Sequence, residues 1–134
     1  MNAPRLPADR LMFRKPIAEI LSDLSRPIPE RLLEKRTQGN QTLTYVPWHH
    51  AARLLDFYAP GWEGQVTEIK QVANYVVVTY QITIHAAEGA FSRQATGQES
   101  LEGKTFGDCV CNAEAQAFKR ACAKWGLGLD LYDS

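Results

Sequence analysis

The strongest constraint on the fold is an alternating run near the middle of the 134-residue sequence. In YVVVTYQITI the large apolar side chains occupy every second position: Val76, Val78, Tyr80, Ile82 and Ile84. Successive side chains of a β-strand point to opposite faces, so this alternation buries one face of a sheet. Together with the residues before it, the run predicts two antiparallel strands within residues 65–89, with a turn near Ala73 and Asn74.

Helical patterns precede this region. Apolar side chains at helical spacing predict a helix over residues 17–24, and a second one over residues 48–58 that Pro60 and Gly61 bring to an end. Between them, IPERLLEKR (residues 28–36) predicts a short helix with a positive C-terminal end. The Gly39-Asn40 pair that follows predicts a β-hairpin with a polar, exposed tip.

A third strand and a long helix complete the pattern. Residues 91–100 are a candidate strand in which Gly97 marks either a bulge or a close backbone approach. Asp108 is the expected N-cap of a helix over residues 109–126. Strands and helices do not alternate, which favours an α+β fold. We expect an antiparallel sheet of about three long strands plus a β-hairpin, packed on the long C-terminal helix, with short N-terminal helices.

Length and charge narrow the class of protein. The chain suits one domain, which we divide into an N-terminal extension with a short helix (residues 1–28) and the main domain (residues 29–134). Lys and Arg number 15, as do Asp and Glu, so the chain is not expected to coat nucleic acid over its whole surface. No apolar run is long enough to cross a membrane.

The N-terminal residues and the cysteines indicate in which cellular compartment the protein is expected. The first residues have no apolar core of a signal peptide, and Asp9 and the prolines interrupt the amphipathic helix of a transit peptide. Three cysteines in one predicted helix could not form the disulfide framework of a secreted protein. The sequence therefore predicts a cytoplasmic protein, associated with the nucleoid if it is bacterial.

The predicted C-terminal helix has two unlike sides. A wide side is apolar: Val110, Ala113, Ala117, Phe118, Ala121, Cys122 and Trp125. Lys119, Arg120 and Lys124 lie on the other side with no acid among them. Either the helix dipole favours these cations near the C-terminus, or they bind a row of phosphates. Glu114 falls within the apolar side, where a buried carboxylate would need a partner. Either it lies at an edge of that side, or it reaches a neighbouring subunit, or the boundary of the apolar side is drawn in the wrong place.

Two sequence blocks carry a family resemblance. FKRACAKWGLGLDLYD resembles the end of the conserved domain of the ring-forming single-strand annealing proteins, the Rad fifty-two superfamily with its bacterial and phage DdrA-like branch. TYVPWHHAARLLDFYAPGWEGQV is similar to the same family's aromatic entry to a helix that ends before Gly-Trp and the first long strand. The resemblance covers residues 30–133 and agrees with the predicted order of elements.

The resemblance implies a function and a set of site residues. It implies a homo-oligomeric ring or arc that binds single-stranded DNA by its phosphates and anneals complementary strands in recombinational repair, without ATP. Protection of DNA ends is a further candidate role. Lys119 and Arg120 match the family's paired phosphate-binding cations, while Ala123 stands where a third arginine is expected and makes Lys124 a candidate substitute. Arg36, with Lys35 beside it, is the nearest match to the arginine that faces these cations from the hairpin.

Other chemistries have weaker support. Cys109 and Cys111 could join His49, His50 or His85 in a zinc site, but thiols two positions apart on a helix point in different directions. Nothing near Cys122 would lower the pKa of a nucleophilic thiol. We therefore expect no catalytic residue, cofactor, metal or small-molecule substrate. The alternatives are a non-DNA oligomeric adaptor domain of the same fold and a small hydrolase.

Aromatic residues have two interpretations. Tyr45, Trp48, Trp62 and Trp125 could stack on bases of a single strand. Trp62 and Trp125 stand at the ends of predicted elements, which favours a packing role for these two.

Overall fold

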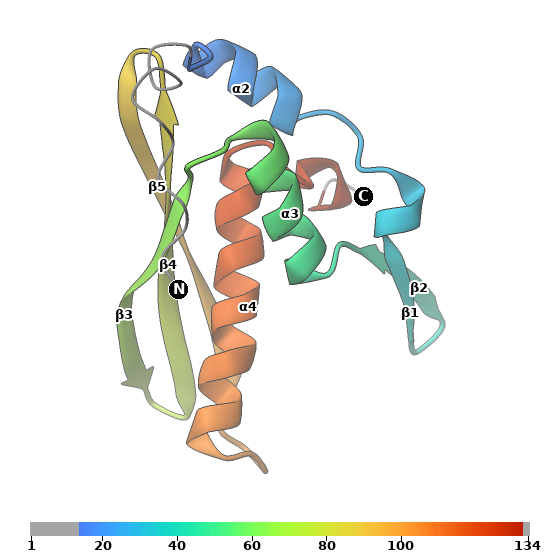
Figure 1. Ribbon diagram of the computed structural model, residues 1–134. Coiled ribbons are helices and arrows are strands. Elements are labelled where there is room, and N and C mark those ends of the chain that lie inside the picture. Colours follow the sequence, from blue (N-terminus) through green and yellow to red (C-terminus); the bar gives the residue numbers. More distant parts are fainter. Residues whose placement is uncertain (1–13, 133–134) are drawn as a thin grey trace.

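A computed structural model describes residues 14–132 and confirms the α+β prediction. Figure 1 shows its elements, which in chain order are helix α2 (Ile17–Leu24), the 3-10 turn η1 (Glu30–Leu32), strands β1 (Glu34–Gln38) and β2 (Gln41–Tyr45), helix α3 (Trp48–Tyr58), strands β3 (Glu63–Val72), β4 (Tyr75–Ala86) and β5 (Gly89–Ser100), helix α4 (Phe106–Lys124) and the 3-10 turn η2 (Leu129–Tyr132).

The three long strands form one antiparallel sheet in the order β3-β4-β5. The alternation that predicted β4 holds, because Val76, Val78, Ile82 and Ile84 are all fully buried on one face. Strands β1 and β2 form a separate hairpin whose turn contains Gly39, at a φ of +65°. In β3 the register shifts between Val66 and Glu68, which marks a β-bulge in this edge strand.

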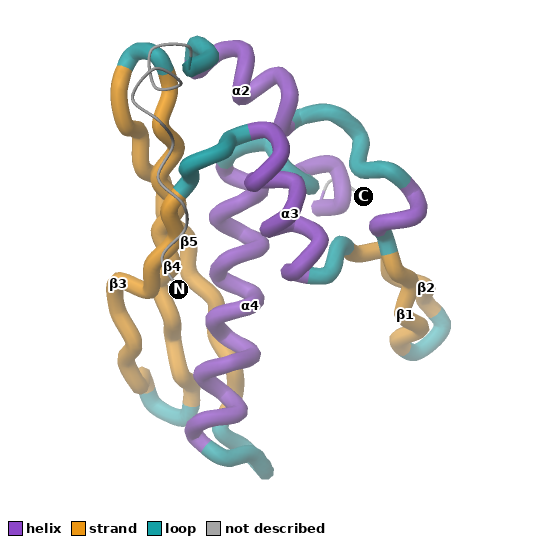
Figure 2. Tube along the Cα trace, in the orientation of Figure 1, coloured by secondary structure: helices purple, strands orange, loops and turns teal. Residues whose placement is uncertain are grey.

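Helix α4 lies along one face of the sheet, over β4 and β5, and α3 lies beside it (Figure 2). The close approach depends on small side chains. A Cβ atom added to Gly97 would lie 2.3 Å from the carbonyl oxygen of Ala113 and 2.6 Å from the amide nitrogen of Ala117. Gly97 pairs with Val78 in unbroken register, so the close approach is correct and the alternative of a bulge is wrong.

The main core joins the upper half of the sheet to all three helices. Trp125 is 1% exposed, and its indole N–H donates a 3.3 Å hydrogen bond to the carbonyl oxygen of Ile82. Leu24 of α2 and Leu55 of α3 are fully buried in the same core. This confirms Trp125 as a packing anchor. Helix α2 also packs here and is part of the core. The division of the chain into an extension and a main domain at residue 28 stays a prediction.

The ends of α4 differ slightly from the prediction. The helix begins at Phe106, and the N-cap is Thr105, whose hydroxyl accepts a 3.1 Å hydrogen bond from the amide of Asp108. Asp108 lies in the first turn instead, where its charge favours the positive end of the helix dipole. At the other end Gly126 has a φ of +97°, and the amide of the next residue donates to the carbonyl of Cys122, which gives a Schellman C-cap.

The predicted helix over residues 28–36 is wrong. Only Glu30–Leu32 form a single 3-10 turn, and Glu34–Gln38 form β1. A short segment gains little from helix formation, whereas pairing with β2 supplies a ladder of hydrogen bonds. The change matters for the cations, because neighbours on a strand point to opposite faces and Lys35 and Arg36 therefore diverge.

Candidate nucleic-acid interface

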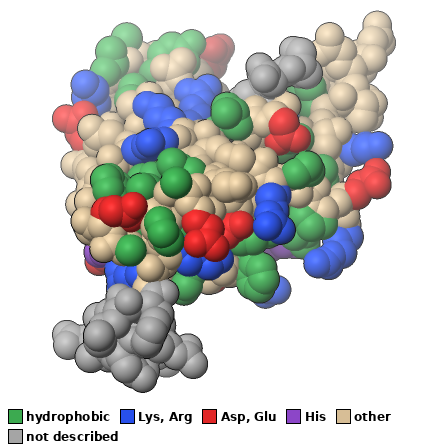
Figure 3. All heavy atoms as spheres, turned by 90° about the horizontal axis from the view of Figure 1, so that it is seen from above, with side chains coloured by type: hydrophobic (Ala, Val, Ile, Leu, Met, Phe, Trp, Pro, Cys, Tyr) green, Lys and Arg blue, Asp and Glu red, His purple; other side chains and the backbone are tan. Residues whose placement is uncertain are grey.

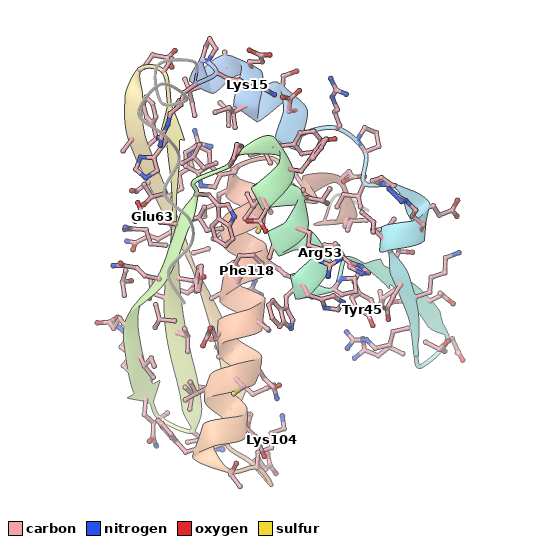
Figure 4. The ribbon with its side chains drawn as sticks, viewed as in Figure 1. Lys15, Tyr45, Arg53, Glu63, Lys104 and Phe118 are labelled. Carbon is pink, nitrogen blue, oxygen red and sulfur yellow. The ribbon has the colours of Figure 1, made fainter. Side chains whose placement is uncertain are left out.

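Two cations meet in a pocket between the hairpin and α4. Arg36 of β1 and Lys119 of α4 both line this cavity of about 210 Å³, with Tyr45 at the root of the hairpin (Figure 4). The guanidinium carbon of Arg36 lies 5.5 Å from the centre of the Tyr45 ring, and the ammonium nitrogen of Lys119 lies 5.3 Å from it. Both distances are typical of cation–π contacts. The structure thus brings together one candidate cation of the hairpin and one of α4.

The electrostatics of this pocket favour an incoming anion. Burial lowers the pKa of Lys119, and the positive charge of Arg36 lowers it further. Among the described residues, neither cation forms an ion pair with a carboxylate. A half-buried ammonium that is repelled by a second cation is stabilised by a negative group placed between them.

Arg120 and Lys124 lie elsewhere, along the free edge of β5. The guanidinium of Arg120 donates a 3.1 Å hydrogen bond to the carbonyl oxygen of Thr96, and the ammonium of Lys124 donates a 2.7 Å bond to that of Gln94. One turn earlier, Gln116 accepts a 2.9 Å bond from the amide of Gln98. These three α4 side chains, four residues apart, are called the edge row below. The helical spacing predicted one group of three cations. In the structure Lys119 lies at the hairpin, whereas Arg120 and Lys124 lie along β5.

Lys35 is exposed and is absent from the pocket that Arg36 lines. Its side chain points to the opposite face of the hairpin, as the alternation of a strand requires. The structure therefore does not bring Lys35 to the other predicted DNA-binding residues of its own chain.

Sequence reasoning missed Arg93 of β5. Its guanidinium lies 4.3 Å from the centre of the Trp125 ring and donates a hydrogen bond to the carbonyl oxygen of Lys124. Arg93 thus binds the negative end of the α4 dipole, a role that the sequence suggested for Lys124 and the other helix cations. Arg93 lies on a strand 31 residues from its partner, so no helical pattern could have indicated the contact.

Comparison with known proteins assigns the family. Residues 16–134 match the Rad52/22 family of double-strand break repair proteins. The chain belongs to this family. This confirms the superfamily inferred from the two sequence blocks, and it associates the fold with DNA repair.

Two Arabidopsis thaliana proteins are similar to this Rad52/22-family chain. It is 38% identical over 120 residues to "DNA repair RAD52-like protein 1, mitochondrial", a match that covers 88% of the chain and 68% of the relative. It is 40% identical over 122 residues to "DNA repair RAD52-like protein 2, chloroplastic", with 88% of the chain and 61% of the relative covered. The predicted cytoplasmic or nucleoid location is wrong, because both relatives are named for organelles.

Glu114 of the Rad52/22-family domain is exposed, so it is not a buried carboxylate within the apolar side of α4. It lines a second cavity, of about 300 Å³, between α3, α4 and the sheet. The other residues of this cavity, called the aromatic pocket below, are Trp48, Ala52, Trp62, Tyr80, Cys111, Ala115 and Phe118. Helix α4 packs on β4 and β5, and Glu114 lies where this cavity opens beside the packed side, which agrees with the edge position that the sequence allowed.

The candidate zinc ligands of the family domain lie in different surroundings. Cys109 is buried and its thiol donates to the carbonyl oxygen of Ser100, while Cys111 is exposed. The His85 ring lies 2.7 Å from a carboxylate oxygen of Glu63. Within residues 14–132, no group of three His, Cys, Asp or Glu side chains is placed to hold a metal ion. No helix in this range is both long and apolar enough to span a membrane.

Proposed function

We propose that this chain binds single-stranded DNA through its phosphates and anneals complementary strands as a homo-oligomeric ring or arc. The observation that carries the proposal is the pair Arg36 and Lys119 around Tyr45, two cations without an acidic partner in the described part of the chain. Annealing breaks no covalent bond, so the reaction needs no catalytic residue and no nucleotide. Membership of the Rad52/22 family of double-strand break repair proteins supports the same function.

Repetition of the site would resolve the mismatch between zero net charge and DNA binding. One copy offers a few cations and would bind a strand weakly. Copies that engage successive nucleotides add their contributions at high effective concentration, so that a neutral chain can still hold DNA firmly. Figure 3 shows Lys and Arg side chains among Asp and Glu on the face seen from above, without a field of one sign.

The remaining cations have secondary roles in the proposal. Arg120 carries five N–H donors, so it can keep its bond to Thr96 and still contact a phosphate. Lys124 keeps two N–H donors beyond its bond to Gln94 and can serve in the same way. The proposed annealing domain is residues 29–134, and the names of the two relatives favour DNA of an organelle as its setting.

Oligonucleotide binding of charge variants tests the proposal. Fluorescence anisotropy of a labelled single strand, repeated at several salt concentrations, gives the affinity and its salt dependence. Lys119→Ala should weaken binding and reduce the slope of log K against log salt by about 0.7, the value for one lost phosphate contact. Lys104→Ala is the matched control, because Lys104 pairs with Glu99 beyond the opposite end of α4. Equal behaviour of the two variants would place the interface elsewhere.

Annealing and assembly are measured separately. Complementary strands labelled with a fluorophore and a quencher should pair faster with the protein than without it, and ATP should make no difference. Light scattering gives the mass of the assembled protein. The alternative, a non-DNA oligomeric adaptor, would assemble but would not shift an oligonucleotide even at low salt.

A further inference from the structure

The hairpin presents a free surface. All residues of β1 and β2 are exposed except the partly buried Tyr45, and the hairpin extends away from the rest of the fold (Figure 1). It packs on its own chain mainly through the pocket at its root. A two-stranded hairpin is marginal by itself in water, so its outer face gains from a further contact.

Lys35 is the charged residue of that outer face. It pairs across the hairpin with Thr44, and its neighbours on the same face are the small polar residues Thr37 and Thr42. Lys35 forms no ion pair with any described residue. The outer face is thus a flat, polar platform with one projecting ammonium group.

The aromatic pocket has the opposite character. Phe118 lies 6.0 Å from Trp62 and 5.3 Å from Tyr80, measured between ring centres, and Trp48 at its rim is 58% exposed. Such a large exposed tryptophan on an open cavity is typical of a binding surface. The pocket involves α3, α4 and β4 and none of the hairpin.

Glu114 gives this pocket its charge. It is the one carboxylate among the described residues of the lining, and no described cation pairs with it. Glu114 and Tyr80 line the same cavity; burial raises the pKa of Tyr80, and the negative charge of Glu114 raises it further. Aromatic rings with a carboxylate at their edge favour a cation on an apolar stem.

We propose that Lys35 of one copy enters the aromatic pocket of the next copy, with its alkyl stem against the aromatic rings and its ammonium group at Glu114. This inference rests on the proposed self-assembly and identifies the contact that produces it. The two surfaces are different parts of the chain, so the contact is head-to-tail, the kind that generates rings or arcs. A nucleobase is a poorer occupant, because the carboxylate repels the phosphates that accompany it.

A charge exchange tests the pairing without DNA. Lys35→Glu and Glu114→Lys should each lower the assembled mass in light scattering at a fixed concentration, and the double variant should restore it. Glu102→Lys, which alters an exposed acid in the loop before α4, should leave the mass unchanged. Thermal unfolding of each variant shows whether the monomer still folds. Failure of the double variant to recover the assembled mass, with all variants folded, would overturn the proposal.

Cross-linking tests the same contact by proximity. Cys111 is exposed and lines the pocket, so a Thr37→Cys variant, which places a thiol on the face of Lys35 and keeps Lys35 itself, should link neighbouring copies through Cys111 when treated with a short bismaleimide. A head-to-tail contact gives a ladder beyond the dimer on a denaturing gel. The ladder should vanish with Cys111→Ser added, and Gln41→Cys, on the other face of the hairpin, should give none. An assembled protein that yields no ladder contradicts this contact alone, whereas a monomeric wild type contradicts the proposed assembly.

Discussion

Replacing Gly97 by alanine should push α4 away from β5 and destabilise the fold. The added Cβ would lie 2.3 Å from the carbonyl oxygen of Ala113 and 2.6 Å from the amide nitrogen of Ala117, where ordinary contacts begin at 3.4 Å. Both atoms belong to the helix backbone, so no side-chain rotation relieves the clash. Relief requires a movement of about 1 Å between α4 and β5, in a core packed as tightly as a crystal.

Such overpacking costs about 1 to 3 kcal/mol of unfolding free energy. For a domain of this size, that cost lowers Tm by roughly 3 to 15 °C. Thermal unfolding followed by circular dichroism and urea denaturation measure the effect. Gly107→Ala is the control, because its added Cβ meets no atom within 4 Å and the residue lies in the first turn of α4.

The control variant should be more stable than the wild type by about 0.5 to 1 kcal/mol, since alanine restricts the unfolded chain. A Gly97→Ala protein that unfolds at the wild-type temperature would refute the reasoning. It would mean that the helix does not lie on β5 at the distance described.

Three further predictions concern single side chains. A phosphate favours the protonated form of Lys119, whose pKa is lowered in the free protein. Affinity for single-stranded DNA should therefore be full below that pKa and fall as the pH rises through it. Anisotropy at constant ionic strength measures this pH dependence, and Lys119→Gln should remove it. In protein dilute enough to be dissociated, iodoacetamide should modify the exposed Cys111 rapidly and Cys122 only on unfolding, because Cys122 is buried and burial raises the pKa of its thiol. Mass spectrometry of digests measures both rates, and equal rates would contradict the prediction. Arg93→Ala should lower the free energy of unfolding by about 1 to 2 kcal/mol, because it removes the contacts with Trp125 and the end of α4. The salt dependence of DNA binding should stay unchanged. A reduced salt slope would mean instead that Arg93 contacts the DNA.

The sheet and the long helix could be predicted because their signals are local. The alternation around Val78 requires only that one face of β4 be buried, and the structure buries it. The Gly39-Asn40 turn and the prolines that flank α3 act within a few residues. Gly97 was also informative, because a glycine inside a strand pattern indicates either a bulge or a close neighbour.

The site was only partly predictable, because its geometry depends on contacts between distant residues. Lys35 and Arg36 have helix-compatible neighbours, and only pairing with β2 makes them part of a strand. Helical spacing could not show that Lys119 and Arg120 lie at different sites, because this depends on the hairpin on one side of α4 and on β5 on the other. The sequence could not choose among the alternatives for Glu114, because the surroundings of this residue depend on which strands the helix covers.

The edge row of Gln116, Arg120 and Lys124 also limits how the protein can aggregate. Unpaired main-chain groups on an outer strand are the usual template for strand addition between molecules, and here α4 side chains already occupy those of Gln94, Thr96 and Gln98. At the opposite edge, the bulge of β3 interrupts the ladder. Copies of this chain are therefore steered away from joining into one endless sheet. In the proposed assembly, copies meet through side chains, and contacts of that kind can be released and formed again.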